Sequence, residues 1–151
     1  PVLQAQWHSD SILLDVFKNI IDDDKIIIEL GAGYGYNLHV LSQTFEDCEF
    51  TGGELSENGV TLGNKLYKNR SGINMSKFNY YDQNYDILEE QFDSDIIVLT
   101  RLSLEQLPKC KSVISKLMKY KHNLDTVVHL EPVYEMHDES TILGLLRKKY
   151  A

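Results

Sequence analysis

The stretch Ile26–Tyr36 reads IIIELGAGYGY, and it decides the fold of the chain. Three aliphatic residues at 26–28 predict a short buried strand, and the residues from Asn37 onward have the pattern of a helix start. Between them, glycines alternate at positions 31, 33 and 35. Glycine adopts positive φ and lets the backbone approach a ligand without a Cβ in the way. A helix that follows such a turn directs its N-terminal amides and positive dipole end toward the ligand.

The spacing of the glycines excludes two common nucleotide-binding motifs. The dinucleotide fingerprint G-x-G-x-x-G, counted from Gly31, would need its third glycine where the chain has Tyr36. A phosphate-binding P-loop needs Lys followed by Ser or Thr after the last glycine, and Tyr36-Asn37 does not supply that pair. The pattern that remains is E-x-G-x-G-x-G, which begins at Glu29.

Apolar patterning along the rest of the chain predicts a regular alternation of strands and helices. Strands are expected over residues 25–30, 48–53, 73–79, 95–100 and 126–130, and helices over 10–21, 36–45, 56–69, 85–91, 104–120 and 138–150. Residues 1–8 are expected to form a loose lead-in. Runs such as DIIVLT lack two-residue alternation, which is typical of strands covered on both faces. The order predicts a single Rossmann-like α/β domain, 1–151, with a doubly wound, mainly parallel sheet.

Acidic residues follow the first three predicted strands. Glu29 lies at the end of the first strand, Glu54 follows the second and Asp82 follows the third, while Thr100 ends the fourth. In an open parallel sheet, ligands bind beyond the carboxyl ends of the strands. A carboxylate accepts two hydroxyl donors at once, and charge-assisted hydrogen bonds are about twice as strong as neutral ones. These positions therefore suit a positively charged nucleoside with free ribose hydroxyls.

The E-x-G-x-G-x-G turn, the segment GGELS around Glu54 and the pair Tyr81-Asp82 together resemble the class I S-adenosylmethionine-dependent methyltransferases, over residues 10–135. The resemblance implies S-adenosyl-L-methionine as the cofactor. It implies that Glu54 accepts the ribose hydroxyls, that Asp82 contacts the adenine amino group and that Glu29 lies near the methionine end. The cofactor-binding set that it implies is Glu29, Gly31, Ala32, Gly33, Gly35, Glu54, Leu55, Asp82 and Thr100.

The same resemblance implies transfer of a methyl group to an O or N atom of a small-molecule acceptor, with sugars as one candidate class. The segment TRLSLEQLP at 100–108 stands where the adenine- and glutamine-methylating branches carry a proline-flanked N/D-P-P-Y motif. It therefore speaks against those two branches. Residues that border the region, including Arg101, Glu105, His129 and Glu131, leave the general base open.

The chain departs from the family at its C-terminal end. The family's sheet has seven strands, of which the last two form an antiparallel hairpin, and this sequence ends one helix after the fifth. The chain is therefore a fragment, which its start at Pro1 also suggests, or has an abbreviated sheet, or uses a partner to cover the edge. An unpaired fifth strand predicts a homodimer through that edge. Two rival functions stay open: a non-catalytic or truncated methyltransferase-like binding domain, and an NAD-type Rossmann module.

Composition excludes several other classes of function. A net charge of −8 and a pI near 5.0 argue against nucleic acid and anionic membrane surfaces as partners. No apolar run reaches the length of about 18 residues that a membrane span needs. Cys48 and Cys110 are isolated, which fits a reducing cytoplasm and suggests neither disulfides nor a zinc site. Some small-molecule methyltransferases bind a divalent ion after the fifth strand, but no ligand spacing around His129 and Glu131 supports one strongly, so no metal is predicted.

Overall fold

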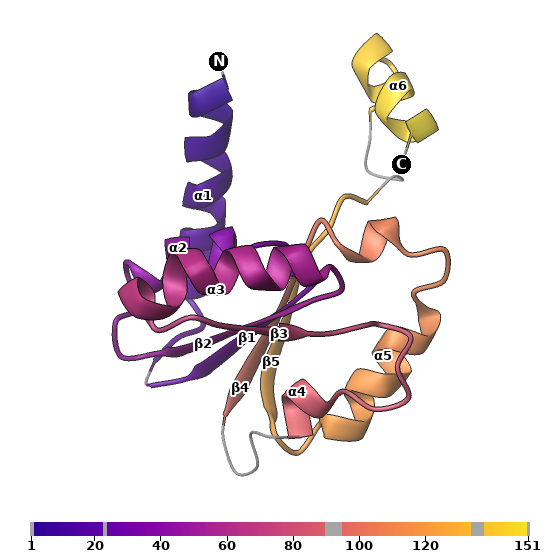
Figure 1. Cartoon of the computed structure of the whole chain (residues 1–151). Helices are drawn as coiled ribbons and strands as arrows, with labels where there is room; N and C mark the ends of the chain where they lie inside the picture. Colours follow the sequence, from indigo (N-terminus) through magenta and orange to yellow (C-terminus); the bar gives the residue numbers. More distant parts are fainter. Residues whose placement is uncertain (1, 23, 90–94, 134–137, 151) are drawn as a thin grey trace.

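The computed structural model describes residues 2–22, 24–89, 95–133 and 138–150. Within these residues, five parallel strands form one sheet in the order β3-β2-β1-β4-β5 (Figure 1), which confirms the predicted doubly wound α/β fold. Because strand order reverses on either side of β1, a crevice is expected at the carboxyl ends of β1 and β4. The strands are β1 Ile26–Leu30, β2 Glu49–Glu54, β3 Asn74–Lys77, β4 Ile96–Arg101 and β5 Leu124–Leu130.

Helices cover both faces of the sheet (Figure 1). The first three helices lie on one face and share an apolar core with it, while α4 and α5 cover the other. None of the described helices is long and apolar enough to cross a membrane. The α-helices are α1 Val2–Lys18, α2 Tyr36–Ser42, α3 Glu57–Ser71, α4 Asp86–Glu89, α5 Lys111–Leu117 and α6 Ile142–Tyr150, and the 3-10 helices are η1 Leu104–Gln106 and η2 Met118–Tyr120.

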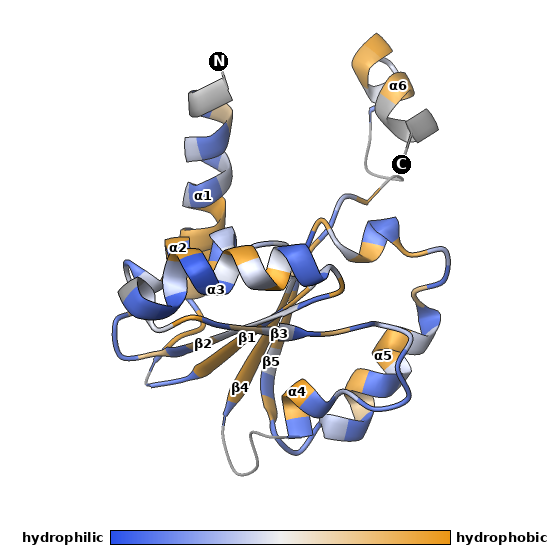
Figure 2. Ribbon diagram, viewed as in Figure 1, coloured by the Kyte–Doolittle hydropathy of each residue, from blue (hydrophilic) through white to orange (hydrophobic). Residues whose placement is uncertain are grey.

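The central strands are apolar because they are buried on both faces. In β1, Ile27 belongs to the core under α1 and α2, whereas Ile28 belongs to the core under α4 and α5. In β4, Ile97 and Val98 divide in the same way. Figure 2 shows these two strands as predominantly hydrophobic ribbons. Strands with two buried faces carry no polar alternation, and this is the physical basis of the apolar runs in the sequence.

The prediction of a loose lead-in over residues 1–8 is wrong. Helix α1 begins at Val2, and its second half packs Leu13 and Phe17 into the core under the sheet. Its first turns project from the body of the molecule (Figure 1), and the Trp7 side chain is 73% exposed. Because these turns bury so little apolar surface, apolar periodicity carries no signal there.

The predicted single helix over 104–120 is also wrong. The structure divides it into η1, α5 and η2, with residues 107–110 outside any helix. Pro108 has no amide hydrogen to donate within a helix, and its ring disfavours helical backbone at the residue before it. The Glu131 carboxylate accepts hydrogen bonds from the amides of Ser103 and Leu104, which holds the start of η1 against the end of β5.

The outer edge of β5 gives the first testable prediction. Among the described residues, β5 pairs with β4 alone, and alternate residues of β5 such as Val127 are exposed. We expect two chains to associate through this edge, because unpaired strand edges readily pair with another strand. Sedimentation velocity over a range of concentrations checks this. Val127→Lys should shift the distribution toward monomer, and a wild-type chain that is monomeric throughout would contradict the homodimer.

Candidate cofactor-binding site

The glycine turn after β1 has the geometry that its sequence predicts. Gly31, Gly33 and Gly35 all have left-handed backbone, with φ of 77°, 59° and 87°. The amides of Gly31 and Ala32 donate to the carbonyl of Gly53 at 2.8 and 3.0 Å. The turn is therefore tied to the end of β2 before the chain enters α2.

Two of these glycines are required for different reasons. A Cβ at Gly31 would lie 2.6 Å from the Cβ of Ser103, so the segment after β4 packs directly on the turn. A Cβ at Gly33 would meet nothing within 4 Å, so the backbone there faces open space. A bare backbone beside open space is what a ligand lying along the turn requires.

A cavity of about 360 Å³ opens beside the turn, at the carboxyl ends of the strands. Its volume falls within the range of small-molecule sites, roughly 300–1,000 Å³. Two apolar side chains at the cavity, Leu55 and Tyr81, are 58% and 52% exposed and offer surfaces for a flat ring. Its lining includes Gly31, Gly33, Glu54, Leu55, Asn79 and Tyr81.

Glu54 lines this cavity and braces the turn. Its Oε2 accepts a hydrogen bond from the amide of Gly33 at 2.9 Å, and its Oε1 accepts one from the amide of Ser56 at 2.7 Å. Ser56 is the N-cap of α3, and its hydroxyl accepts from the amide of Gly59. Each carboxylate oxygen accepts more than one hydrogen bond, so Glu54 keeps acceptor capacity for a ligand's hydroxyl groups.

Glu29 is fully buried, and only one of its two carboxylate oxygens accepts a hydrogen bond from the described residues. Oε1 accepts a hydrogen bond from Nδ2 of Asn37 at 2.6 Å, whereas no donor among the described residues reaches Oε2. Burial raises the pKa of Glu29 from 4.5 to about 7, against the lowering effect of the Asn37 hydrogen bond and the Arg101 charge. The nearby charge of Glu54 raises the pKa further. A buried carboxylate oxygen without a donor is uncommon, and Glu29 is not among the residues that line the cavity.

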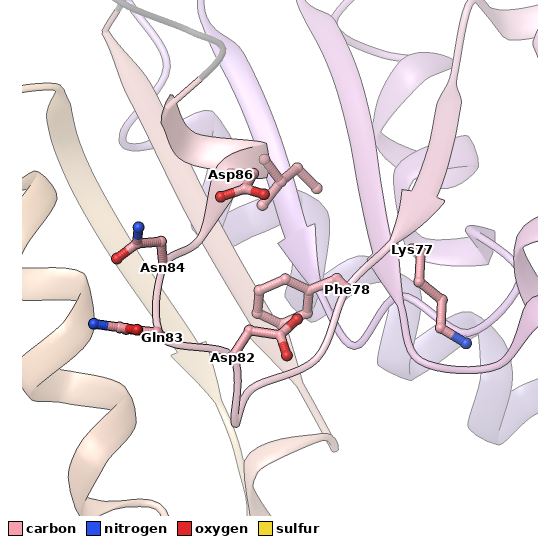
Figure 3. A pocket seen from close by; sticks show the side chains of 7 residues that line it. Lys77, Phe78, Asp82, Gln83, Asn84 and Asp86 are labelled. Carbon is pink, nitrogen blue, oxygen red and sulfur yellow. The ribbon is translucent and has the colours of Figure 1, made fainter.

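Asp82 lies in a neighbouring hollow and does not line the cavity beside the turn. This hollow of about 290 Å³ is also lined by Lys77, Phe78 and Asp86 (Figure 3). The cavity beside the turn shares Phe78 with it and has Asn79 where the sequence suggested Asp82. Within the described part of the chain, no three His, Cys, Asp or Glu side chains are grouped to hold a metal ion.

The remaining predicted site residues divide between the turn and the sheet. Ala32 and Gly35 belong to the turn, and Gly35 immediately precedes α2. Thr100 is fully buried, and its Oγ1 lies 2.8 Å from Nδ1 of His129 on β5. The structure therefore brings Gly31, Gly33, Glu54 and Leu55 together around one cavity and holds Thr100 inside the sheet.

Two residues outside the predicted cofactor-binding set, Tyr80 and Ser103, support the turn from beneath. The hydroxyl of Tyr80 donates to the carbonyl of Leu30 at 2.6 Å and lies 2.9 Å from Oγ of Ser103. Burial raises the pKa of Tyr80, so the phenol stays protonated and keeps its donor. Ser103 is fixed in turn by Glu131, which accepts from its amide at 3.0 Å. These contacts join residues at least 23 positions apart, and no local pattern marks them.

The segment after β4 is strained where it reaches the cavity. Leu102 has a φ of 52°, a left-handed conformation that is uncommon for a residue with a Cβ. Its amide donates to the carbonyl of Leu130, and its own carbonyl accepts from Nε2 of Gln106 at 2.6 Å. Such strain persists only where the surroundings fix it, and it is concentrated at functional sites. The change of direction at Leu102 places Ser103 and Gln106 in the lining of the cavity.

Sheet order, a left-handed glycine turn after β1 and an acid at the end of β2 give this chain the fold of the class I S-adenosylmethionine-dependent methyltransferases. No protein-family model and no curated protein sequence matches the chain. Solved structures do match, at low sequence identity. The chain spans about half the length of the structures it resembles.

Three of these structures show the range of the similarity. A Galdieria sulphuraria protein assigned as a sarcosine dimethylglycine methyltransferase is 15% identical, with a TM-score of 0.60, over 87% of this chain and 46% of its own. The plantazolicin methyltransferase BpumL, solved with a triazolic desmethylPZN analogue and S-adenosylhomocysteine, is 18% identical, with a TM-score of 0.58, over 93% and 51%. The cyclase SpnF is 15% identical, with a TM-score of 0.60, over 82% and 41%.

Proposed function

We propose that this chain is the cofactor-binding domain of an S-adenosylmethionine-dependent methyltransferase that acts on an O or N atom of a small molecule, with sugars among the candidate acceptors. One observation carries the proposal: the bare backbone at Gly33 lies beside a cavity that Glu54 also lines, and Glu54 holds the same backbone in place. The methyltransferase names of several structural neighbours, and the S-adenosylhomocysteine bound to BpumL, support the choice of cofactor.

In this proposal, the residues that line the cavity and the acids near it hold different parts of the cofactor. The carboxylate of Glu54 accepts the ribose hydroxyls, and Leu55 and Tyr81 contact the adenine ring. The unmatched oxygen of Glu29 stabilises the cationic methionine end, since a buried carboxylate favours a nearby positive charge. Asp82 is proposed as a contact of the adenine amino group, because its hollow adjoins the cavity at Phe78. Thr100 would act indirectly, by holding the end of β4.

When bound, S-adenosylmethionine supplies an electrophilic methyl group. The residues of the chain bind and orient the reactants, and such orientation lowers barriers by several kcal/mol. A hydroxyl acceptor also needs a general base. Both His129 and Glu131 make internal hydrogen bonds, to Thr100 and to the amides of η1, so we assign neither as that base.

A second candidate function is a methyltransferase-like binding domain that does not transfer methyl groups. Two observations favour it: the chain spans about half the length of its structural neighbours, and one neighbour with the same fold is named a cyclase. Fold does not fix the reaction. A transfer assay with radiolabelled S-adenosylmethionine and a panel of sugars and small metabolites separates the two. Label in a small molecule supports the methyltransferase, and cofactor binding without label in any acceptor supports the binding domain.

Direct binding measurements test the choice of cofactor. We expect isothermal titration calorimetry to show binding of S-adenosylhomocysteine and no binding of NAD, because the glycine spacing lacks the dinucleotide fingerprint. Thermal unfolding gives a second readout, since a ligand that binds only the native state raises the midpoint. Binding of NAD without S-adenosylhomocysteine would replace the proposal with the NAD-type Rossmann module.

Glu54→Ala tests the residue on which the proposal depends most. We expect S-adenosylhomocysteine binding to weaken by about 1.5–3 kcal/mol, because the variant loses hydrogen bonds to a charged group. Calorimetry measures the change. Glu57→Ala is the matched control, because Glu57 is an exposed acid three residues away in the first turn of α3. Equal affinities of wild type and Glu54→Ala would refute the assigned role.

A further inference from the structure

A chain of polar side chains connects Glu29 to α1. Oε1 of Glu29 accepts from Nδ2 of Asn37 at 2.6 Å, and Oδ1 of Asn37 accepts from the Arg101 guanidinium at 2.9 Å. The guanidinium also donates to the carbonyl of Ser9 at 2.9 Å and to the Ser9 hydroxyl. β1, α2, β4 and α1 each supply one member of this chain. A second contact fastens α1 nearby, where the Tyr36 hydroxyl donates to Asp10 at 2.9 Å.

Asn37 has the side chain that this position requires. It must present a donor to a carboxylate and an acceptor to a guanidinium, and a short amide does both in one orientation. Aspartate would present an acceptor to Glu29, and leucine would present neither group. In this orientation the Asn37 amide serves Glu29 and Arg101 at the same time.

The charge of Glu29 depends on these neighbours. The groups that act on its carboxylate are Asn37 from α2, Arg101 from β4 and Glu54 from β2. Burial favours the neutral form of Glu29, and the charge of Glu54 does so as well. Asn37 and Arg101 favour the ionised form. Protonation of Glu29 would weaken the Asn37 hydrogen bond, because hydrogen bonds to a charged acceptor are the stronger ones.

We propose that Asn37 and Arg101 are positioning residues of the cofactor site, which hold the Glu29 carboxylate in place and transmit its charge state to the docking of α1. When Glu29 is ionised, Asn37 is fixed and Arg101 keeps its hydrogen bonds to Ser9. When Glu29 is neutral, the hydrogen bonds between Arg101 and Ser9 weaken and α1 moves more freely. The consequence for cofactor affinity rests on the proposed function, whereas the coupling itself is a property of the ligand-free chain.

The test follows two signals in the ligand-free protein as pH is varied. Carboxyl-carbon NMR follows Glu29, assigned with Glu29→Gln, and fluorescence anisotropy follows Trp7, the only tryptophan of the chain, which lies in α1. In wild type we expect both signals to change with one midpoint, with lower anisotropy on the acid side. In Asn37→Leu we expect the proton affinity of Glu29 to rise roughly tenfold, because a hydrogen bond to the ionised form is lost.

Asn64→Leu is the matched control. Asn64 also makes two hydrogen bonds through one side chain, with the amide and carbonyl of Met75, and it touches neither Glu29 nor α1 in any hydrogen bond. It should lower stability without moving either midpoint. The proposal is overturned if the pH midpoint of Glu29 is the same in Asn37→Leu as in Asn64→Leu. It is also overturned if the Trp7 anisotropy does not change with the same pH midpoint as the Glu29 signal.

S-adenosylhomocysteine affinity measured across the same pH range extends the test. We expect the wild-type affinity to fall on the acid side of the Glu29 midpoint, and the fall to begin at higher pH in Asn37→Leu. Absence of binding at every pH would refute the proposed function, while the ligand-free titrations would still decide the coupling.

Discussion

Gly31→Ala is expected to destabilise the protein by about 2–5 kcal/mol, the largest effect of any single substitution considered for this chain. Left-handed backbone costs an alanine about 1–2 kcal/mol. The new Cβ would also lie 2.6 Å from the Cβ of Ser103 and 3.2 Å from the Tyr80 hydroxyl, and crowding of this kind costs about 1–3 kcal/mol. Ser103 cannot easily move, because Glu131 and the carbonyl of Leu30 hold it.

Gly33→Ala is the matched control for this prediction. Gly33 is also left-handed, but an added Cβ would meet nothing within 4 Å, so only the backbone term of about 1–2 kcal/mol applies. Urea unfolding of the two variants measures the difference. The two variants should also differ in cofactor affinity. Gly33→Ala should bind more weakly, since its methyl group enters the space proposed for the cofactor. Equal destabilisation by both would contradict the close packing of the segment after β4 on the turn.

Glu29→Gln is expected to remove a decrease of about 3 kcal/mol in the free energy of unfolding, which Glu29 causes as pH rises from 4.5 to 7. The native pKa of Glu29 is raised to about 7 from an ordinary value of 4.5, so the native state binds the proton more tightly than the unfolded chain does. The contribution of Glu29 to stability therefore falls as pH rises from 4.5 to 7 and stays low above that window. Glutamine is neutral throughout, so the variant lacks this decline.

The pH dependence is a sharper readout than stability at any single pH. The glutamine amide leaves an NH₂ group without an assigned acceptor, but that cost does not change with pH. Chemical unfolding between pH 4.5 and 8 gives the two curves, which should diverge as pH rises. Glu49→Gln, at an exposed position at the start of β2, controls for removing one negative charge from a chain of net charge −8. Parallel curves for wild type and Glu29→Gln would contradict the buried, unmatched carboxylate.

The parts of the site that local sequence could predict are those that obey local rules. The turn is marked by Gly31, Gly33 and Gly35, because positive φ selects glycine within a few residues. Glu54 lies at the cavity because the carboxyl ends of parallel strands meet at one edge of the sheet. The start of α3 lies within one residue of the predicted start at residue 56, because an N-cap is a property of one helix start.

The parts that local sequence does not show depend on contacts between distant segments. Asp82 follows β3 as Glu54 follows β2, but the chain between β3 and α4 places it in the adjoining hollow and leaves Asn79 at the cavity. Tyr80 and Ser103 meet beneath the turn across 23 positions of sequence. Arg101 reaches Ser9 across 92 positions. No periodicity or spacing reports such pairs, because each member has an ordinary local environment.

By itself, the sequence determined the class of fold, the order of strands and helices, and the place of the glycine turn. It could do so because burial on two faces, helix capping and positive φ each restrict residue type within a short window. Only the tertiary structure decided which acids share a cavity, which serine supports the turn and how Glu29 is tied to α1. Those outcomes depend on the path of the loops between strands, and loop paths are set by long-range packing rather than by local preference.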